Sequence, residues 1–203
     1  MDISRFQGIP TGNICDSNDR MGAMDPAIQA LDRHMTLVGR AYTVQCPPGD
    51  NLTIHKAMVE AQPGDVLVVS CQGFVHAGGF GELMATACQV KGIAGIVIDG
   101  ACRDKNELIE MNFPTFVRAT CPNGTVKERC GATGGTVVCG GSTVRTGDII
   151  VGDCDGVVVI PADRAEAVLE KSLAKKASED VIRSQLLEGI STAELFNLTP
   201  KFQ

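Results

Sequence analysis

The sequence predicts an α/β protein with a parallel sheet, a mostly β section and a long C-terminal helix. In residues 65–112, two short aliphatic runs alternate with helical patterns, which is typical of parallel strands joined by right-handed crossovers. From 116 to 160, Val-rich runs are separated by turn residues at the spacing of short strands. From Pro161 to about Leu187 the pattern is helical. These three observations define the predicted fold class.

The composition is that of a globular protein with an aliphatic core. The chain has 203 residues, 44% of them hydrophobic and 21% charged, with 23 glycines and no Trp. A chain of this length forms one domain, or a small domain with an appendage. The net charge of −6 argues against a nucleic-acid partner, because binding to phosphates requires a basic face.

Nine cysteines are scattered singly along the chain, and no pair has the C-x-x-C spacing. This pattern is not a disulfide framework, so we interpret most of them as small buried hydrophobes in a reducing cytosol. The N-terminus lacks an apolar signal core, and no apolar run approaches the ~20 residues of a membrane span. We therefore expect a cytoplasmic protein.

The first part of the chain alternates helix and strand signals. Thr11 or Asn13 is expected to cap a short helix that ends near Gly22. Residues 36–46 are expected to form a strand, which the sequence Pro47-Pro48-Gly49 stops.

A helix capped by Asp50 or Asn51 then runs to about Ala61. A buried strand over 66–70 leads into a glycine-rich loop over 73–81. The next helix is expected to carry its apolar residues on one side: Leu83, Met84, Ala87 and Val90.

The central strand is expected over 95–99, followed by a turn and a helix from about 105 to 111. The β section contains four Val-rich runs: 115–118, 135–139, 148–151 and 157–160. After the long helix, Gly189 acts as the stop signal and a last short helix covers 192–196.

The glycine loop before residue 82 has two interpretations. Gly79-x-Gly81 lies between a strand and a helix, with Asp99 twenty residues later, which mimics a dinucleotide fingerprint. However, Met84 occupies the third glycine position and would hold the helix away from the sheet. The alternative is that the glycines let helix N-terminal N–H groups approach a small anion such as a carboxylate.

Charged residues gather at the ends of two adjacent predicted strands. Asp99, Arg103 and Asp104 follow the central strand, and Glu82 begins the preceding helix. Parallel strands bring such ends together, so Glu82 and Asp104 could converge on one cation with Arg103 beside it. Alternatively, Glu82 only complements the helix dipole and Arg103–Asp104 is a surface pair.

The block from Gly81 to Asp104 resembles the signature of the 4-hydroxy-4-methyl-2-oxoglutarate aldolase group. That group includes 4-carboxy-4-hydroxy-2-oxoadipate aldolases and the related regulator of ribonuclease activity A. The resemblance extends from about Thr11 to about Ile160. It implies a swivelling β/β/α catalytic domain over 1–160 and a helical extension over 161–203 that packs on a neighbouring subunit of a homotrimer or hexamer.

The resemblance also implies roles for three charged residues. Arg103 matches the arginine that binds pyruvate and stabilises its enolate. Asp104 matches the direct ligand of Mg²⁺ or Mn²⁺, and Glu82 matches the acidic residue that holds a water of that metal. The cofactor implied is therefore a divalent metal.

Further residues are matched around the substrate. The backbone N–H groups of Leu83 and Met84, beside Gly81, match those that receive the pyruvate carboxylate. Glu179 is matched by position to a carboxylate that the neighbouring subunit supplies and that binds the metal through water. Its alternative is an ordinary i,i+4 pair with Arg183.

Four other residues have weaker cases. Asp99 is interpreted as a brace for the turn after the central strand. His34, His55 and His76 have no partner at metal spacing, so each is interpreted as a packing or surface residue. His76 lies before Gly81 and could reach the substrate.

The implied function is that of a class II pyruvate aldolase. Such an enzyme cleaves a 4-hydroxy-2-oxo acid, such as 4-hydroxy-4-methyl-2-oxoglutarate, to pyruvate and an oxo acid, with oxaloacetate decarboxylation as a side activity. The alternative is a non-catalytic regulator that binds and inhibits a ribonuclease. That regulator is shorter, so the extension from Pro161 to Gln203 favours the enzyme.

Overall fold

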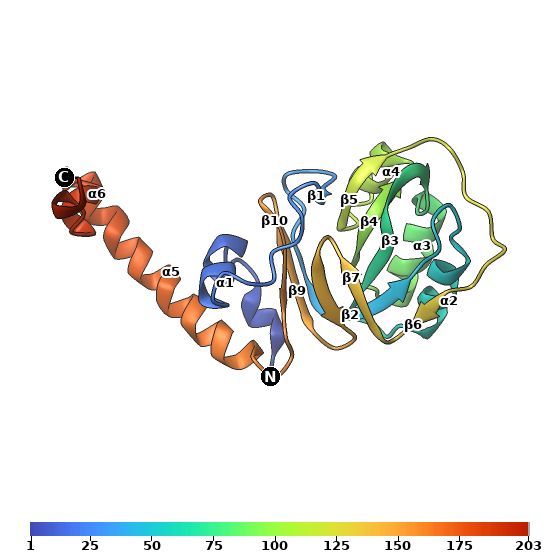
Figure 1. Cartoon of the computed structure of the whole chain (residues 1–203), viewed down its shortest axis with the longest axis horizontal. Coiled ribbons are helices and arrows are strands. Elements are labelled where there is room, and N and C mark those ends of the chain that lie inside the picture. Colours follow the sequence, from blue (N-terminus) through green and yellow to red (C-terminus); the bar gives the residue numbers. More distant parts are fainter. Residues whose placement is uncertain (203) are drawn as a thin grey trace.

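The computed structural model describes residues 1–202, and its centre is an eight-stranded mixed sheet. The strands pair in the order β1-β5-β4-β3-β2-β9-β10, with β6 also pairing with β2. An isolated bridge between Ala23 and Val158 brings the chain before β1 against β10, so the sheet curls into a near-barrel. Figure 1 shows this sheet with a long helix projecting from one end. The bounds are β1 (Gln29–Ala30), β2 (Leu37–Gln45), β3 (Asp65–Gly78), β4 (Gly95–Cys102), β5 (Thr115–Thr120), β6 (Ala132–Thr133), β9 (Ile149–Asp153) and β10 (Gly156–Ile160).

The parallel part of the sheet is made of β2, β3, β4 and β5. Three helices connect these strands: α2 (Leu52–Glu60), α3 (Glu82–Lys91) and α4 (Lys105–Glu110). These helices cover the face of β4 that carries Ile96 and Ile98, and strands of the β section cover the face that carries Val97, so every residue of β4 is buried. The predicted α/β class, with its parallel core and its long C-terminal helix, is confirmed.

The antiparallel part follows the Val-rich section of the sequence. β9 and β10 extend the sheet beyond β2, and the separate hairpin of β7 (Thr136–Cys139) and β8 (Ser142–Arg145) packs near β3. The four predicted strands of this section are therefore present as β5, β7, β9 and β10. The sequence patterns missed β8, β6 and β1, which are too short to show a clear period.

Strand β3 is much longer than the sequence predicted. The expected loop over 73–78 continues the strand to Gly78, with irregular pairing to β4 after Ser70 and again after Phe74. Its partner β4 likewise runs to Cys102 rather than ending at Asp99. Irregular pairing hides the period-2 pattern, which explains why the sequence showed a loop here.

Helix α1 (Thr11–Ser17) ends five residues before the predicted Gly22, and neither Thr11 nor Asn13 is its cap. Pro10 occupies the cap position without a side-chain hydrogen bond. Instead, the Asp153 carboxylate at the end of β9 accepts from the Thr11 N–H at 2.8 Å and from the Thr11 hydroxyl at 2.7 Å. A distant acid therefore satisfies the helix terminus.

Helix α3 packs through small residues rather than through its larger apolar ones. Ala85 and Cys88 are its buried residues, whereas Leu83 is 77% exposed and Val90 is 86% exposed. Of the predicted apolar face, Leu83, Ala87 and Val90 are exposed in a single chain, and Met84 alone packs against the core. Small residues on the inner side let the helix lie close against the sheet.

Most of the cysteines contribute to the aliphatic core. Five of the nine cysteines are buried, and none within residues 1–202 forms a disulfide. Burial raises the pKa of Cys88 and Cys102 to about 12, so both thiols stay protonated and pack as hydrophobes. Cys130 and Cys154 are exposed.

Helix α5 (Ala165–Leu187) packs on the sheet and on α1, and its contacts with α1 reach as far as Glu179. Its buried residues all lie near its start: Ala165, Val168, Leu169 and Ser172. The outer half projects away from the body and ends in the short helix α6 (Thr192–Leu195), as Figure 1 shows. Within residues 1–202, no helix combines the length and the apolar character needed to cross a membrane.

Candidate active site

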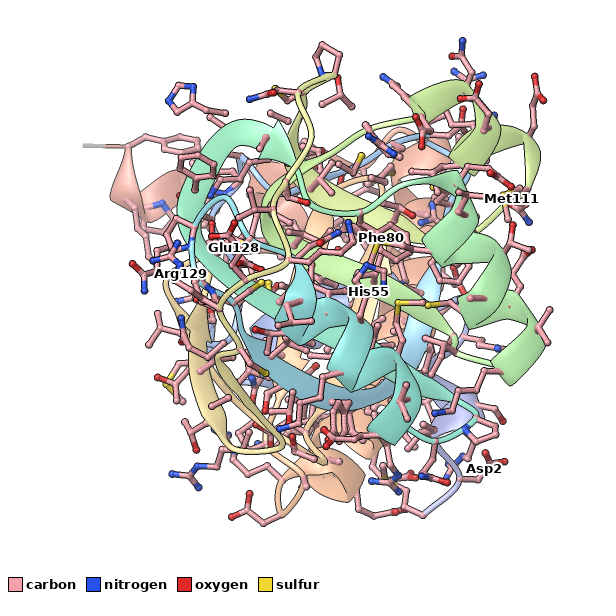
Figure 2. All side chains as sticks on the ribbon, turned by 90° about the vertical axis from the view of Figure 1, so that its right-hand side faces the viewer. Asp2, His55, Phe80, Met111, Glu128 and Arg129 are labelled. Atoms are coloured by element: carbon pink, nitrogen blue, oxygen red, sulfur yellow. The ribbon has the colours of Figure 1, made fainter. Side chains whose placement is uncertain are left out.

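The main candidate site is a pocket of about 230 Å³ at the carboxyl ends of β3 and β4. Ligand sites in parallel α/β sheets lie at this edge, where the loops leave for the helices. Residues from α2, α3, the β4–α4 turn and the segment after β5 line the pocket. Figure 2 looks onto this side of the molecule, with Phe80 and His55 near the centre of the view.

The glycine loop lets two strand ends approach each other closely. A Cβ atom at Gly81 would lie 2.4 Å from Asp104 Oδ2, and one at Gly78 would lie 2.9 Å from Arg103 Cβ. The Arg103 N–H donates to the Phe80 carbonyl at 2.9 Å, which joins the two loops. The absence of side chains at these glycines therefore creates the site's geometry.

Asp104 is held in an uncommon backbone conformation at the start of α4. Its φ is +55° and its ψ is +47°, in the left-handed region that non-glycine residues seldom adopt. The Glu82 N–H donates to Asp104 Oδ2 at 3.1 Å, and Arg103 Nε lies 3.5 Å from the same oxygen. These contacts and the left-handed backbone thus hold the Asp104 carboxylate in place at the pocket.

The donor set at Asp104 fits a hard divalent cation. Its Oδ1 has no hydrogen-bond partner within residues 1–202, and the side chain is 37% exposed at the pocket. The same residues contain no group of three or more His, Cys, Asp or Glu side chains placed to hold a metal. A cation with one protein carboxylate and several waters is a form of coordination that Mg²⁺ tolerates.

Helix α2 supplies a second, polar wall that the sequence did not predict. Asn51 and His55 lie one helical turn apart and both line the pocket. Burial, together with the nearby positive charge of Lys127, lowers the pKa of His55 below its usual value. His55 was expected to be a packing or surface residue, and its i,i+4 spacing from Asn51 was the only available signal.

The segment after β5 forms a third wall through Gly124, Thr125 and Lys127. Asp50, which is 2% exposed, holds this segment in place. One carboxylate oxygen accepts from the Leu52 N–H at 2.9 Å, and the other accepts from the backbone N–H groups of Glu128 and Arg129 at 2.9 and 2.7 Å. Burial opposes ionisation of Asp50, but these three hydrogen bonds outweigh it and lower the pKa.

The pocket brings together five of the residues that the sequence singled out: Gly81, Leu83, Met84, Arg103 and Asp104. Of the two expected amide donors, the Met84 N–H donates to the Gly81 carbonyl at 3.1 Å, whereas the Leu83 N–H has no partner within residues 1–202. The Leu83 amide is therefore the one available to a carboxylate.

Two residues of the predicted site, Glu82 and His76, do not line the pocket. The Glu82 carboxylate accepts from the Thr86 hydroxyl at 2.9 Å along α3. His76 packs its ring edge-on against Phe74, with 5.5 Å between ring centres. Neither side chain is among those that line the pocket of this chain.

Glu179 lies on α5, at the opposite end of the chain from the pocket (Figure 1). It accepts from Asn13 at 2.9 Å and pairs with Lys175 at 3.4 Å. The alternative pair with Arg183 is wrong, because Arg183 pairs with Asp180 at 2.8 Å. Glu179 could therefore reach a pocket only in another copy of the chain.

Asp99 points away from Arg103 and Asp104, so the expectation that the three are presented together is wrong. It accepts hydrogen bonds from Arg118 Nε and from the Gly140 N–H, the latter at 3.0 Å. Arg118 also pairs with Asp25 at 2.9 Å. Asp99 is thus a brace, as expected. However, it connects β4 to β5 and to the β7–β8 turn, and it does not brace the turn after β4.

Replacing Arg118 by methionine should lower the free energy of unfolding by about 3 kcal/mol, because the variant leaves the buried carboxylate of Asp99 without its positively charged partner. Urea denaturation would measure this loss. The matched control is Arg183→Met, whose pair with Asp180 is about two-thirds exposed and should contribute less than about 1 kcal/mol. Equal losses in both variants would contradict the bracing role.

Comparisons with known proteins agree with this architecture. Residues 11–159 match the family model described as RraA-like, Aldolase/RraA. The chain is 40% identical over 188 residues to a protein of Halalkalibacterium halodurans that is provisionally named a 4-hydroxy-4-methyl-2-oxoglutarate aldolase, covering 93% of this chain and 90% of that one.

Solved structures extend the similarity to the fold. RraAS2 from Streptomyces coelicolor, described as an unusual member of the RNase ES inhibitor RraA family, is 27% identical with a TM-score of 0.81 and covers 90% of this chain and 96% of its own. The RNA-processing inhibitor RraA of Thermus thermophilis is also 27% identical, with a TM-score of 0.69 over 75% of this chain and 92% of its own. Together with the family match, these similarities show that the chain belongs to the RraA-like Aldolase/RraA family.

Proposed function

We propose that this protein is a divalent-metal-dependent pyruvate aldolase that cleaves a 4-hydroxy-2-oxo acid such as 4-hydroxy-4-methyl-2-oxoglutarate. The observation that carries the proposal is the joint placement of Arg103, Asp104 and the free Leu83 N–H in one pocket. A carboxylate and an adjacent oxo group need such a set of positive groups and donors. The volume of about 230 Å³ suits a small acid and is below the roughly 300–1,000 Å³ of sites for larger ligands.

Each residue of the pocket has a defined task in this proposal. Asp104 would hold Mg²⁺ or Mn²⁺, which as a Lewis acid would stabilise an enolate when bound. The Leu83 N–H would bind the substrate's C1 carboxylate. Arg103 would donate to the C2 oxygen and stabilise its negative charge as it develops.

The proposed cleavage moves one proton and breaks one carbon–carbon bond. The proton of the C4 hydroxyl leaves to a water held by Glu82, and a C4–O double bond forms. The C3–C4 bond breaks, and its electron pair moves into the enolate of pyruvate beside Arg103. That water then returns a proton to C3 of the enolate to give pyruvate. Oxaloacetate decarboxylation passes through the same enolate, so we expect it as a side activity.

We also propose that the active protein is a homo-oligomer, a trimer or hexamer, in which α5 packs on a neighbouring subunit. The outer part of the C-terminal extension exposes several large apolar side chains: Val181 at 61%, Leu187 at 85%, Phe196 at 52% and Phe202 at 70%. Exposed apolar patches of this kind favour contact with another protein surface. In such an assembly Glu179 would be delivered to the neighbour's pocket.

Removal of metal is the direct test. Pyruvate release from 4-hydroxy-4-methyl-2-oxoglutarate and from oxaloacetate should disappear in excess EDTA and return with added Mg²⁺ or Mn²⁺, measured with a coupled lactate dehydrogenase assay. Full turnover in EDTA would contradict the role of Asp104.

The family similarity to ribonuclease inhibitors makes a regulator the second candidate. Inhibition of a ribonuclease by a chain that turns over neither acid would favour it.

A further inference from the structure

Two buried polar atoms in the α2 wall of the pocket have no hydrogen-bond partner. Asn51 is 5% exposed, and its Nδ2 donates to the Gly79 carbonyl at 3.0 Å, but its Oδ1 is unpaired. His55 Nε2 is also buried and unpaired within residues 1–202. Buried polar atoms in proteins nearly always have partners, so two unpaired atoms in the wall of one pocket are candidate contacts for a ligand.

The chemistry of the two atoms limits which chemical group can bind to them. The hydrogen bond from Asn51 Nδ2 to the Gly79 carbonyl fixes the orientation of the amide, and its Oδ1 can only accept a hydrogen bond. His55 has a lowered pKa, so near neutral pH its ring is uncharged and carries one N–H donor. With that proton on Nε2, the pair suits a group that both donates and accepts, such as a hydroxyl.

A 4-hydroxy-2-oxo acid with ionised carboxylates has one hydrogen-bond donor, the hydroxyl on C4. The carboxylate and the 2-oxo group of such an acid can only accept, and they match the Leu83 N–H, Arg103 and the cation at Asp104. Asn51 and His55 come from a different wall of the same pocket. They are thus available to the part of the substrate beyond C3.

We propose that Asn51 and His55 form the subsite that hydrogen-bonds the C4 hydroxyl and thereby selects 4-hydroxy-2-oxo acids; this inference rests on the proposed aldolase function. Asn51 Oδ1 accepts from the hydroxyl in the bound substrate, and His55 donates from Nε2 to the hydroxyl oxygen. For cleavage, the hydroxyl proton turns from Asn51 Oδ1 to the water held by Glu82, and His55 continues to donate to the oxygen.

The test compares two substrates that give the same pyruvate enolate. 4-Hydroxy-4-methyl-2-oxoglutarate has a C4 hydroxyl, whereas C4 of oxaloacetate is a carboxylate carbon without one. In His55→Phe and Asn51→Leu, we expect kcat/KM for cleavage to fall about tenfold more than kcat/KM for decarboxylation, the effect of one lost hydrogen bond. His55→Gln, which returns an N–H near the position of Nε2, should restore much of the difference.

Matched controls separate this role from a general loss of the site. Lys56 lies on the same helix, is exposed and pairs with Glu60 at 3.7 Å. The variant Lys56→Gln should therefore leave both activities unchanged. Asn51→Leu also removes the bond to Gly79, so its thermal unfolding is compared with that of the wild type. The His55 variants carry the test if Asn51→Leu does not fold.

The outcomes are distinct. An equal fall in both activities would overturn the subsite and indicate that the two unpaired atoms hold only water or shape the pocket. Wild-type protein that releases pyruvate from neither acid would overturn the aldolase function and the subsite together. A selective loss of cleavage, rescued by His55→Gln, would support the subsite.

Discussion

Replacing Arg103 by alanine should lower pyruvate formation from both acids by about 10²–10³-fold, mainly through kcat. The guanidinium lies beside Asp104 at 3.5 Å and lines the pocket, so in the proposed reaction it faces the oxygen on which charge develops. Removing one such preorganised donor typically costs about 10²–10³ in rate. Steady-state kinetics with a coupled pyruvate assay would measure the effect.

The folded state should tolerate this change, because the Arg103 side chain is nearly half exposed and its pair with Asp104 is open to solvent. Arg103→Lys is the matched control for charge. It keeps the positive charge but loses the planar fork that can bind two oxygens, so it should recover only part of the rate. An alanine variant with wild-type kcat would remove Arg103 from the mechanism.

Replacing Gly81 by alanine should lower the affinity for Mg²⁺ and reduce turnover by about 100-fold. The φ of Gly81 is −159°, which any residue can adopt, so the effect does not come from backbone strain. The new Cβ would lie 2.4 Å from Asp104 Oδ2 and 3.2 Å from Arg103 Cγ, so both side chains must move. Displacing catalytic groups by about 1 Å can cost about 10²-fold in rate.

Gly12→Ala provides the matched control for Gly81→Ala. A Cβ at Gly12 would meet no atom within 4 Å, and this glycine lies in helix α1, where alanine is favoured. Titration of the activity with Mg²⁺ would show a weakened response only in the Gly81 variant. An unchanged metal dependence there would contradict the tight packing of the glycine loop against Asp104.

The sequence was informative where one local pattern determines the structure. The aliphatic runs of β3 and β4 and the glycine loop between them predicted a parallel pair with Arg103 and Asp104 at its edge. Short strands with turn residues between them likewise located most of the β section. These features depend on residues within one or two elements.

The features that the sequence did not reveal depend on contacts between distant segments. Asn51 and His55 join the pocket only because α2 packs beside α3, and a lone histidine on a helix resembles a packing residue. The exposed side of α3 looked like a core face because Leu83 and Val90 are apolar, but small residues occupy the actual contact. Asp99 was expected to brace the turn after its own strand, but its carboxylate accepts from Arg118 of β5 and from the Gly140 N–H, which are distant in the sequence.

The three backbone hydrogen bonds accepted by Asp50 have a mechanical consequence. They tie the segment that carries Lys127 to the start of α2, which carries His55. These two walls are therefore fastened to each other. We expect any widening that admits a bulkier acid or releases a product to come from the opposite side, where α3 and the turn at Asp104 meet.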